Sequence, residues 1–552
     1  MSRNRTLLST LALLLLLSAG GGAAGGRDSI ATADLKTWLT YLSSDQLGGR
    51  QIYTEGLGLA AGYVQTNLAA WGVTPKGDNG TYLQRVAVQG VKTTSHSSVT
   101  VRVGRETRTF KDADGITFPR NAGAKQKVTI DRVEFVGYGL DAPGAKYSDL
   151  AGKALAGTAA IYLGTQAPAV IEGDSARRLL SGRGRWLTDQ VHVAAAVGPE
   201  FDNARGGRPQ ESAEAAANRP DFTTTQRLDH VLVPSVTGSD AFFEFLFSRA
   251  PVKYADLKKK VDARDRVDGF RLADVSITFD VDHEYSVVRT QYSQNIVGVV
   301  EGTDPQLRNT FVAVGAHYDH VGYAENELAD GRRRASPGRI TSGAENDRIW
   351  NGADDDGSGT VAVMALARAF AQGPRPKRSV LFVFHAGEEA GLLGSRYYVD
   401  HPTVPVEQIV AQLNIDMIGR NRDNKDSEAN VVYLVGSDRI SSELHDINRA
   451  ANRALEKPLT LDYEMNDPAD PEQLYFRSDH YSYAQRGVPI IFFTTGLHPD
   501  YHANTDEVSR IEFPKLTRIA QMVYETAWRL GNLDHAPARD NKGPRAGRGV
   551  RE

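Results

Sequence analysis

The sequence predicts an α/β protein: a doubly wound, mixed β-sheet flanked by helices and interrupted by an inserted β-rich segment. From Asn295 onward, short apolar runs alternate with stretches of helical periodicity, as in a sheet with helices on both faces. Between about residues 86 and 135 the pattern changes to short alternating strands. With 552 residues, the chain is too long for one compact core, so several units are expected.

The N-terminus has the pattern of a secretory signal peptide. Arg3 and Arg5 precede an apolar run from Leu7 to Leu17, and small residues follow from Ser18 to Gly26. The run is short for a bilayer span, and a buried helix is the alternative. We expect cleavage near the end of residues 1–26 and a protein exported to the periplasm or the exterior, with no stable membrane insertion afterwards.

Two helices are predicted after this segment, over Ala33–Ser43 and Leu57–Trp71, where apolar residues recur at helical spacing. Gly72 and Pro75 end the second helix. We assign residues 27–129 to the first part of the main domain.

The next region is predicted to be an inserted, substrate-facing module over residues 130–275. Segments 133–139 and 158–164 have strand composition, as does 98–103 before them. Residues 165–230 are rich in Ala, Arg, Asp and Gly, without long apolar periodicity and without a catalytic cluster.

The second part of the main domain is predicted over residues 276–533. Its expected strands are 296–300, 311–316, 379–384, 410–415 and 489–493, of which 379–384 has almost no polar residue, as in a buried central strand. An apolar helix is expected over Thr360–Phe370. The tail, residues 534–552, has almost no apolar content and is expected to be disordered.

Composition excludes several kinds of site. Hydrophobic residues make up 41% and aromatic residues 8%, as in a soluble globular enzyme. A net charge of -4 gives no reason to expect nucleic acid or an anionic membrane as partner. The absence of cysteine excludes a thiolate metal site and a cysteine nucleophile. A metal would therefore need His and carboxylate ligands, which suits Zn²⁺ in a hydrolytic site.

Candidate ligands follow the predicted strands. Sites in open α/β sheets form beyond the carboxyl ends of strands, and four candidates lie within a few residues of such an end: His317, Glu388, Glu389 and Asp416. Asp319 lies two residues after His317, on the same side of an extended segment. It can accept the second ring N–H of a metal-bound His317, although a purely structural His–Asp pair would look the same. His320 is predicted to be a bystander.

Three adjacent aspartates, 354–356, lie in a glycine-flanked turn. They repel one another unless cations or solvent compensate, and a surface turn or a helix N-cap is the alternative. Next to a metal, one carboxylate can bridge two ions. We choose Asp355 for the bridge, with Asp354 and Asp356 supporting it.

The adjacent residues Glu388 and Glu389 can have two different roles. One glutamate can bind a metal while its neighbour takes a proton from water, and we assign the base to Glu388 and the ligand to Glu389. A solvated helix start is the alternative. Asp416 is an acid in an apolar run, so a metal or a salt bridge is expected. His502 is a loop histidine that would mean little by itself.

Five motifs in this order resemble one family. They are Gly315–His320, Asn351–Gly359, Gly387–Ser395, Asn414–Arg420, and Ser478–His480 with His498–Asp506. The resemblance is to the co-catalytic di-zinc aminopeptidases of secreted bacterial enzymes, which are related to glutamate carboxypeptidase, glutaminyl cyclase and transferrin receptor. It covers about residues 290–530 and the N-terminal helices, and it implies a zinc-exopeptidase fold.

The resemblance also implies a site. Two Zn²⁺ ions per chain would be held by His317, Asp355, Glu389, Asp416 and His502, with Asp319 and Asp356 behind them. The peptide bond after the bridging Asp355 is typically cis, Glu388 is the general base, and Tyr475 matches a residue that helps stabilise the oxyanion. The segment that starts at Val136–Gly139 resembles a protease-associated domain.

The function that the resemblance implies is a secreted zinc aminopeptidase acting on peptides. A carboxypeptidase or dipeptidase of the same fold is an alternative, and it would need an arginine such as Arg420 or Arg477 to hold the terminal carboxylate. A glutaminyl cyclase would use one zinc and lack the full bridging set. A metal-free, receptor-like binding module would lack a ligand, whereas all five are present here. Residue preference and oligomeric state stay open.

Overall fold

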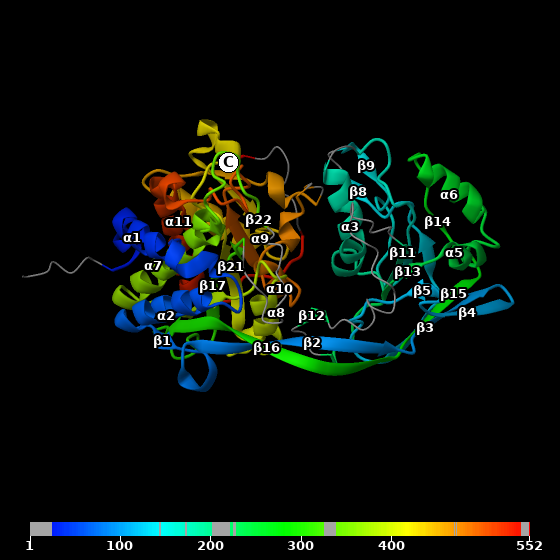
Figure 1. Ribbon diagram of the computed structural model, residues 1–552, viewed down its shortest axis with the longest axis horizontal. Coiled ribbons are helices and arrows are strands. Elements are labelled where there is room, and N and C mark those ends of the chain that lie inside the picture. Colours follow the sequence, from blue (N-terminus) through cyan, green and yellow to red (C-terminus); the bar gives the residue numbers. More distant parts are fainter. Residues whose placement is uncertain are drawn as a thin grey trace, which may run out of the picture.

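A computed structural model describes residues 25–142, 145–171, 174–200, 221–224, 228–324, 338–468, 470, 472–542 and 551–552. The chain forms two lobes joined by a long two-stranded ribbon (Figure 1). Residues 1–24 of the predicted signal peptide and 543–550 of the predicted disordered tail lie outside the described residues. Of the helices that the structure describes, none combines the length and apolarity needed to cross a membrane.

The first lobe is built on a ten-stranded mixed sheet, which confirms the predicted α/β class. Its strand order is β12-β2-β16-β20-β17-β21-β24-β22-β23, with β1 beside β16. The strands are β1 (Thr74–Pro75), β2 (Leu83–Ser95), β12 (Asp221–Thr224), β16 (His283–Val300), β17 (Phe311–His317), β20 (Ser379–His385), β21 (Ile409–Ile415), β22 (Val431–Val435), β23 (Thr460–Asp462) and β24 (Ile490–Thr494). The central strands β20, β17, β21 and β24 run parallel.

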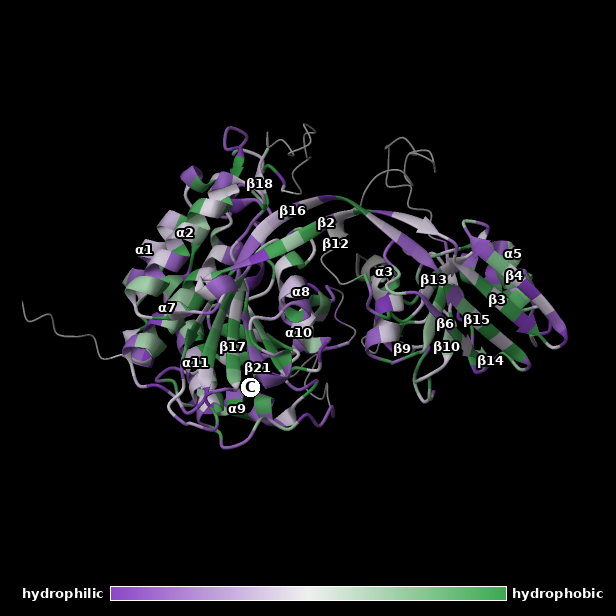
Figure 2. Cartoon of the chain, turned by 90° about the horizontal axis from the view of Figure 1, so that it is seen from below, coloured by the Kyte–Doolittle hydropathy of each residue, from purple (hydrophilic) through white to green (hydrophobic). Residues whose placement is uncertain are grey.

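Helices cover both faces of this sheet. One face packs against α1 (Thr32–Leu42), α2 (Glu55–Ala70), α7 (Gly359–Gln372), α9 (Ser442–Arg453) and α11 (Phe513–Asn532), and the other against α8 (Leu393–Asp400) and α10 (His480–Ala484). Because both faces are covered, every residue of β17, β20 and β21 is buried. Figure 2 shows the apolar residues concentrated on these strands. The apolar runs noted in the sequence form strands of this sheet.

The second lobe has its own ten-stranded sheet and its own apolar core. The order is β14-β7-β10-β11-β13-β5-β4-β3-β15-β6. The strands are β3 (Ser98–Val103), β4 (Glu106–Asp112), β5 (Gly115–Thr117), β6 (Gln126–Ile130), β7 (Val133–Phe135), β10 (Ala159–Ile161), β11 (Ala195–Pro199), β13 (Ser235–Gly238), β14 (Phe270–Arg271) and β15 (Val275–Val281), with helices α3 (Asp174–Asp189), α5 (Asp240–Leu246) and α6 (Tyr254–Asp262).

This sheet extends beyond the predicted insertion at 130–275. It includes β3, β4 and β5, which precede residue 130, and β15, which ends at Val281. The alternating pattern identifies a strand but not its partners, so the boundary could not be read from it. No element was predicted in the stretch that contains α3, whose buried leucines are few: Leu179, Leu180 and Leu187.

Two connections hold the lobes together. The ribbon pairs β2 with β16 from Leu83 opposite Ile296 to Ser95 opposite His283. In addition, α3 lies on the side of the second lobe that faces the first (Figure 2). There Asp189 accepts hydrogen bonds from the hydroxyl of Tyr481 and from the Gln485 amide, the latter at 3.2 Å. The lobes therefore meet beside α10 as well as through the ribbon.

Candidate metal centre

The predicted ligands gather at the carboxyl ends of four neighbouring parallel strands. His317 is the last residue of β17, Glu388 and Glu389 follow β20, Asp416 follows β21, and His502 lies in the loop after β24. Asp355 lies in the turn Ala353–Ser358, just before α7. Because adjacent parallel strands end at the same edge of the sheet, residues far apart in the sequence converge here.

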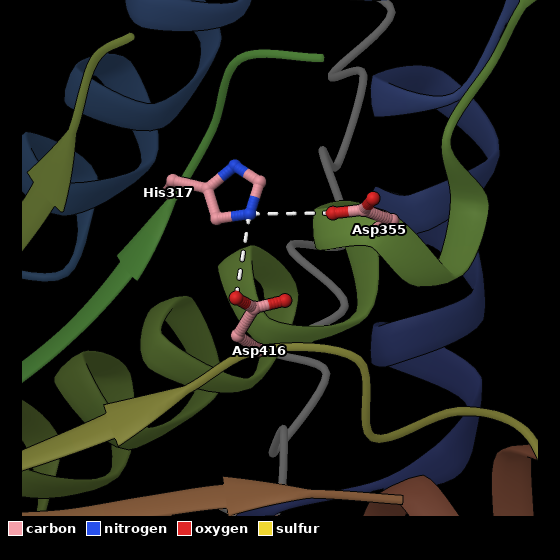
Figure 3. Close-up of side chains that lie close together, drawn as sticks. All are labelled: His317, Asp355 and Asp416. Carbon is pink, nitrogen blue, oxygen red and sulfur yellow. Dashed lines mark ion pairs between the residues drawn. The ribbon is translucent and has the colours of Figure 1, made fainter. Parts of the chain in front are cut away.

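One group of ligand atoms surrounds the ring of His317. Its Nε2 lies 3.3 Å from Asp355 Oδ1 and 3.6 Å from Asp416 Oδ2 (Figure 3). The three residues are buried, with exposed fractions of 1%, 3% and 7%. One atom from each lies within 4.8 Å of the others, close enough to share one ion.

A second group surrounds Glu389. The Oε2 atom of Glu389 lies 2.9 Å from His502 Nε2, and its Oε1 lies 3.0 Å from His320 Nδ1. Asp355 belongs to this group too, because its Oδ2 is 3.2 Å from His502 Nε2. Asp355 thus directs one oxygen at each group, which is the arrangement that a bridging carboxylate requires.

Buried polar atoms in both groups lack hydrogen bonds within the described part of the chain. They are His317 Nε2, His320 Nδ1, Asp355 Oδ2 and Glu389 Oε1. Unpaired buried polar atoms are costly, and four carboxylates (Asp355, Glu388, Glu389 and Asp416) lie together here. Imidazole and carboxylate are also the ligands that Zn²⁺ accepts. Two divalent cations would offset the charge of these carboxylates, so the residues fit a pair of such ions.

Hydrogen bonds fix the turn that carries Asp355. Asp356 accepts from the N–H groups of His317 (3.2 Å), Gly359 (2.9 Å) and Met417 (3.2 Å). Asp354 accepts from the Gly419 N–H at 2.6 Å. The peptide bond between Asp355 and Asp356 is cis, as the resemblance implied. The outer aspartates therefore tie the turn to β17 and to the segment after β21.

Asp319 lies behind both groups, but it contacts His317 differently from the prediction. His317 Nδ1 is 3.1 Å from the backbone oxygen of Asp319 and 3.7 Å from its carboxylate. The hydrogen bond that sets the tautomer of His317 is the one to the backbone oxygen. The carboxylate of Asp319 instead accepts the N–H of Glu388 at 3.1 Å, so it positions the predicted base.

The two adjacent glutamates have opposite electrostatic surroundings. Burial raises the pKa of Glu388 well above its usual range, although His317 opposes the rise. Burial and Asp355 would also raise the pKa of Glu389, but His502 and His320 hold it at about 2. Glu388 lines a pocket with Asp355 and Asp416. The environments favour a proton carrier at Glu388 and a permanent carboxylate at Glu389.

Tyr475 lies away from this pocket. Its ring packs on the guanidinium of Arg439, 3.8 Å from the ring centroid, and lines a different cavity next to α3. The reason is the 3₁₀ turn Leu474–Phe476, in which residues three apart eclipse each other. Leu474 and Arg477 share the side that faces the ligand groups, and Tyr475 points elsewhere. The tyrosine that lines the pocket is Tyr501.

Two residues of the site were missed from the sequence. His320 was expected to be a bystander, but the turn after β17 brings it to Glu389. The sequence feature that could have indicated His320 is its position as a second histidine, three residues after His317. Arg50, with an exposed fraction of 1%, donates to four backbone oxygens, those of Leu42, Tyr318, Asn351 and Gly352, at 2.6–3.0 Å. It ties the N-terminal segment to the turns that carry the ligands.

We expect Arg50→Gln to destabilise the protein by about 3–5 kcal/mol, because the loss of the buried guanidinium leaves backbone oxygens without a donor, at about 1–3 kcal/mol each. Urea denaturation of the chelator-treated protein measures this. Arg105→Gln, at an exposed site in the β3–β4 turn, is the control and should stay within about 0.5 kcal/mol of the parent. A loss below about 1 kcal/mol for Arg50→Gln would show that the arginine does not hold the turns together.

Comparison with known proteins agrees with the resemblance. Residues 295–527 match the model of Peptidase family M28. A "probable leucine aminopeptidase 2" of Aspergillus oryzae is 32% identical over 38% of this chain and 34% of its own. Leupeptin-inactivating enzyme 1 of Streptomyces exfoliatus is 29% identical over 40% and 50%, and aminopeptidase YwaD of Bacillus subtilis is 26% identical over 45% and 47%.

These matches cover part of each relative, so this chain spans between a third and a half of their length. A solved aminopeptidase from Aneurinibacillus sp. strain AM-1 aligns over 95% of this chain and 98% of its own, at 18% identity and a TM-score of 0.44. The family recognised from the sequence motifs is confirmed for the segment 295–527.

Proposed function

We propose that this chain, whose residues 295–527 form a domain of peptidase family M28, is an exported, zinc-dependent aminopeptidase that removes N-terminal residues from peptides. The observation that carries the proposal is Asp355, whose two carboxylate oxygens face two separate groups of His and carboxylate ligands. The aminopeptidase names of the relatives support the direction of attack. The signal-like segment 1–26 supports export.

The ligand groups suggest how two ions would be held. His317 and Asp416 with Asp355 Oδ1 would hold one ion, and Glu389 with His502 or His320 and Asp355 Oδ2 would hold the other. When bound, zinc ions of this kind polarise a carbonyl and make a water molecule acidic near neutral pH.

Glu388 would move the proton. Its raised pKa suits a group that takes a proton from the attacking water and returns it to the leaving amine. Asp319 holds the backbone of Glu388, and the pocket places this residue beside Asp355 and Asp416. The base and one ligand of the second group, Glu389, are therefore adjacent residues of one turn.

A carboxypeptidase of the same fold is the competing function, and one observation favours it. Arg477 lines the pocket beside the ligand groups, where a guanidinium could bind a terminal carboxylate. The other sequence candidate, Arg420, is buried and bonded to Asp500 at 2.8 Å, and it is not among the described residues that line this pocket. Peptides with blocked ends distinguish cleavage at the N-terminus from cleavage at the C-terminus.

The test is a panel of one tripeptide with a free, an acetylated or an amidated end, together with elemental analysis. An α-amine is largely neutral near pH 8 and keeps its lone pair, whereas acetylation delocalises it into an amide. We expect about two zinc ions per chain and a fall in kcat/KM of at least about 100-fold on N-acetylation, with activity surviving amidation. Abolition by amidation and indifference to acetylation would identify a carboxypeptidase instead.

A further inference from the structure

A cavity of about 440 Å³ lies between the end of helix α3 and the first lobe, and we call it the α3 cavity. It is the cavity that the side chain of Tyr475 lines. Both lobes contribute to its wall, and the residues that matter for its chemistry are Asp189, Arg439, Ile440, Tyr475, Tyr481 and Ala484.

The α3 cavity is separate from the metal centre. Strand β22 runs antiparallel to β24, so residues that follow β22 lie beside residues that precede β24. Arg439 follows β22, Gly487 precedes β24, and both line the cavity. The metal ligands instead lie at the carboxyl ends of β17, β20 and β21, and β24 is parallel to β21. The cavity therefore lies at the opposite edge of the sheet.

Arg439 brings an incompletely bonded positive charge to this cavity. Its exposed fraction is 6%, and its Nε and Nη2 donate to the side-chain and backbone oxygens of Asn466 at 3.1 and 2.6 Å. Its Nη1 is buried and has no hydrogen-bond acceptor in the described part of the chain, where no carboxylate forms an ion pair with it either. Unpaired buried donors are costly, and a guanidinium matches the oxygens of a carboxylate.

Asp189 brings a negative charge to the same cavity. Its Oδ2 accepts hydrogen bonds from the Tyr481 hydroxyl and the Gln485 amide, and its Oδ1 accepts one from the Thr188 hydroxyl at 2.8 Å. These donors are neutral, and no cationic side chain among the described residues forms an ion pair with Asp189. The Asp189 carboxylate therefore keeps its charge without a counter-charge.

Both charges lie close to Tyr475. The guanidinium of Arg439 is 3.8 Å from the centroid of its ring, and the ring of Tyr481, whose hydroxyl donates to Asp189, is 6.0 Å from it. A ligand with one charge would match only one of the two. A zwitterion matches both, and a free α-amino acid carries a carboxylate and an ammonium group at neutral pH. Ile440, Ala484 and the tyrosine rings offer apolar surface to its side chain.

We propose that the α3 cavity binds a free α-amino acid with an apolar side chain, with the carboxylate at Arg439 and the ammonium group at Asp189. The binding does not depend on the proposed function, but a peptidase of that kind releases such amino acids. The site would therefore hold a product of the enzyme away from the metal centre. Because each lobe supplies one of the charges, the ligand would also join the lobes.

The test is equilibrium dialysis of radiolabelled L-leucine with the metal-loaded full-length protein, in an excess of unlabelled L-leucinol. Leucinol keeps an amine that can bind zinc but has no carboxylate for Arg439, so it should displace leucine from the metal centre alone. We expect about one leucine per chain to stay bound, held by the charge-assisted hydrogen bonds of the α3 cavity. Displacement of all the leucine by leucinol overturns the proposal.

The role of Asp189 is tested by a variant with a matched control. Asp189→Asn keeps the shape of the side chain and an oxygen for Tyr481, but the dissociation constant for leucine should rise by at least about tenfold, because the hydrogen bond from the ammonium group loses its charged acceptor. Asp268→Asn, at an exposed site of the same lobe, should keep the parent affinity. Equal affinities in the two variants overturn the proposal.

A comparison on the parent protein tests the same contact without any variant. N-acetyl-L-leucine keeps the carboxylate but has no ammonium group, so it should compete for the leucine that leucinol leaves bound at least about tenfold less well than unlabelled leucine does. Equal competition overturns the zwitterion site. None of these measurements involves peptide cleavage, so the aminopeptidase stands or falls separately, by the panel of blocked tripeptides.

Discussion

Replacing Glu388 with glutamine is expected to lower kcat by about 10²–10⁴-fold, the usual contribution of a positioned general base. Glutamine has nearly the same shape but cannot carry the proton. The backbone N–H of residue 388, which donates to Asp319, is unchanged, so the turn should keep its geometry. Steady-state kinetics on a tripeptide with a free N-terminus measures the effect, and elemental analysis should find the parent metal content.

The neighbouring variant Glu389→Gln is the matched comparison. Glu389 contacts both His320 and His502, and it carries the lowered pKa of the pair. Its loss should therefore weaken metal binding as well as activity. If Glu388→Gln and Glu389→Gln lose metal equally, the assignment of base and ligand within the pair is wrong.

Much of the first lobe could be predicted because its strands are buried on both faces. A strand such as β20, with every residue buried, is largely apolar, and such a run is visible in one sequence. The ligands lie directly after these runs. Once the strands are placed side by side, the rule that parallel strands end at one edge brings His317 and Asp416 together without further information.

The second lobe could be predicted less well, because its strands are short and some of them, such as β3, alternate buried with more exposed residues. Alternation showed that β3 is a strand, but the partner of a strand depends on contacts distant in sequence. The sheet therefore begins earlier than residue 130. The docked helix α3 has few apolar residues and many charges, so no apolar run marked it in the sequence.

Side-chain direction was the other limit. A sequence motif gives the type and position of a residue, but not the direction in which the turn points its side chain. Tyr475 matched a motif, yet the 3₁₀ turn directs Leu474 and Arg477 to the site. In the same way Asp319 lies beside His317, but its backbone oxygen and not its carboxylate accepts the hydrogen bond from the ring.

Replacing Asp355 with asparagine is expected to cost both metal ions. Its Oδ1 faces the His317 group and its Oδ2 faces the His502 and Glu389 group, so one carboxylate serves two sites. An asparagine keeps the shape of the side chain but has one neutral oxygen and an NH₂ that cannot bind a cation. Metal content below about one ion per chain, and a loss of activity of at least about 10³-fold, should follow.

The bridging role predicts a pattern that no single variant could show. Asp416 faces the first group alone and Glu389 the second alone, so Asp416→Asn and Glu389→Gln should each retain about one ion while Asp355→Asn retains neither. Elemental analysis of the three variants, prepared in parallel at one zinc concentration, decides the matter. Equal metal contents in all three would mean that the two groups form one site, in which Asp355 is an ordinary ligand. This difference is expected because both ions need the shared carboxylate of Asp355, whereas Asp416 and Glu389 each hold one ion.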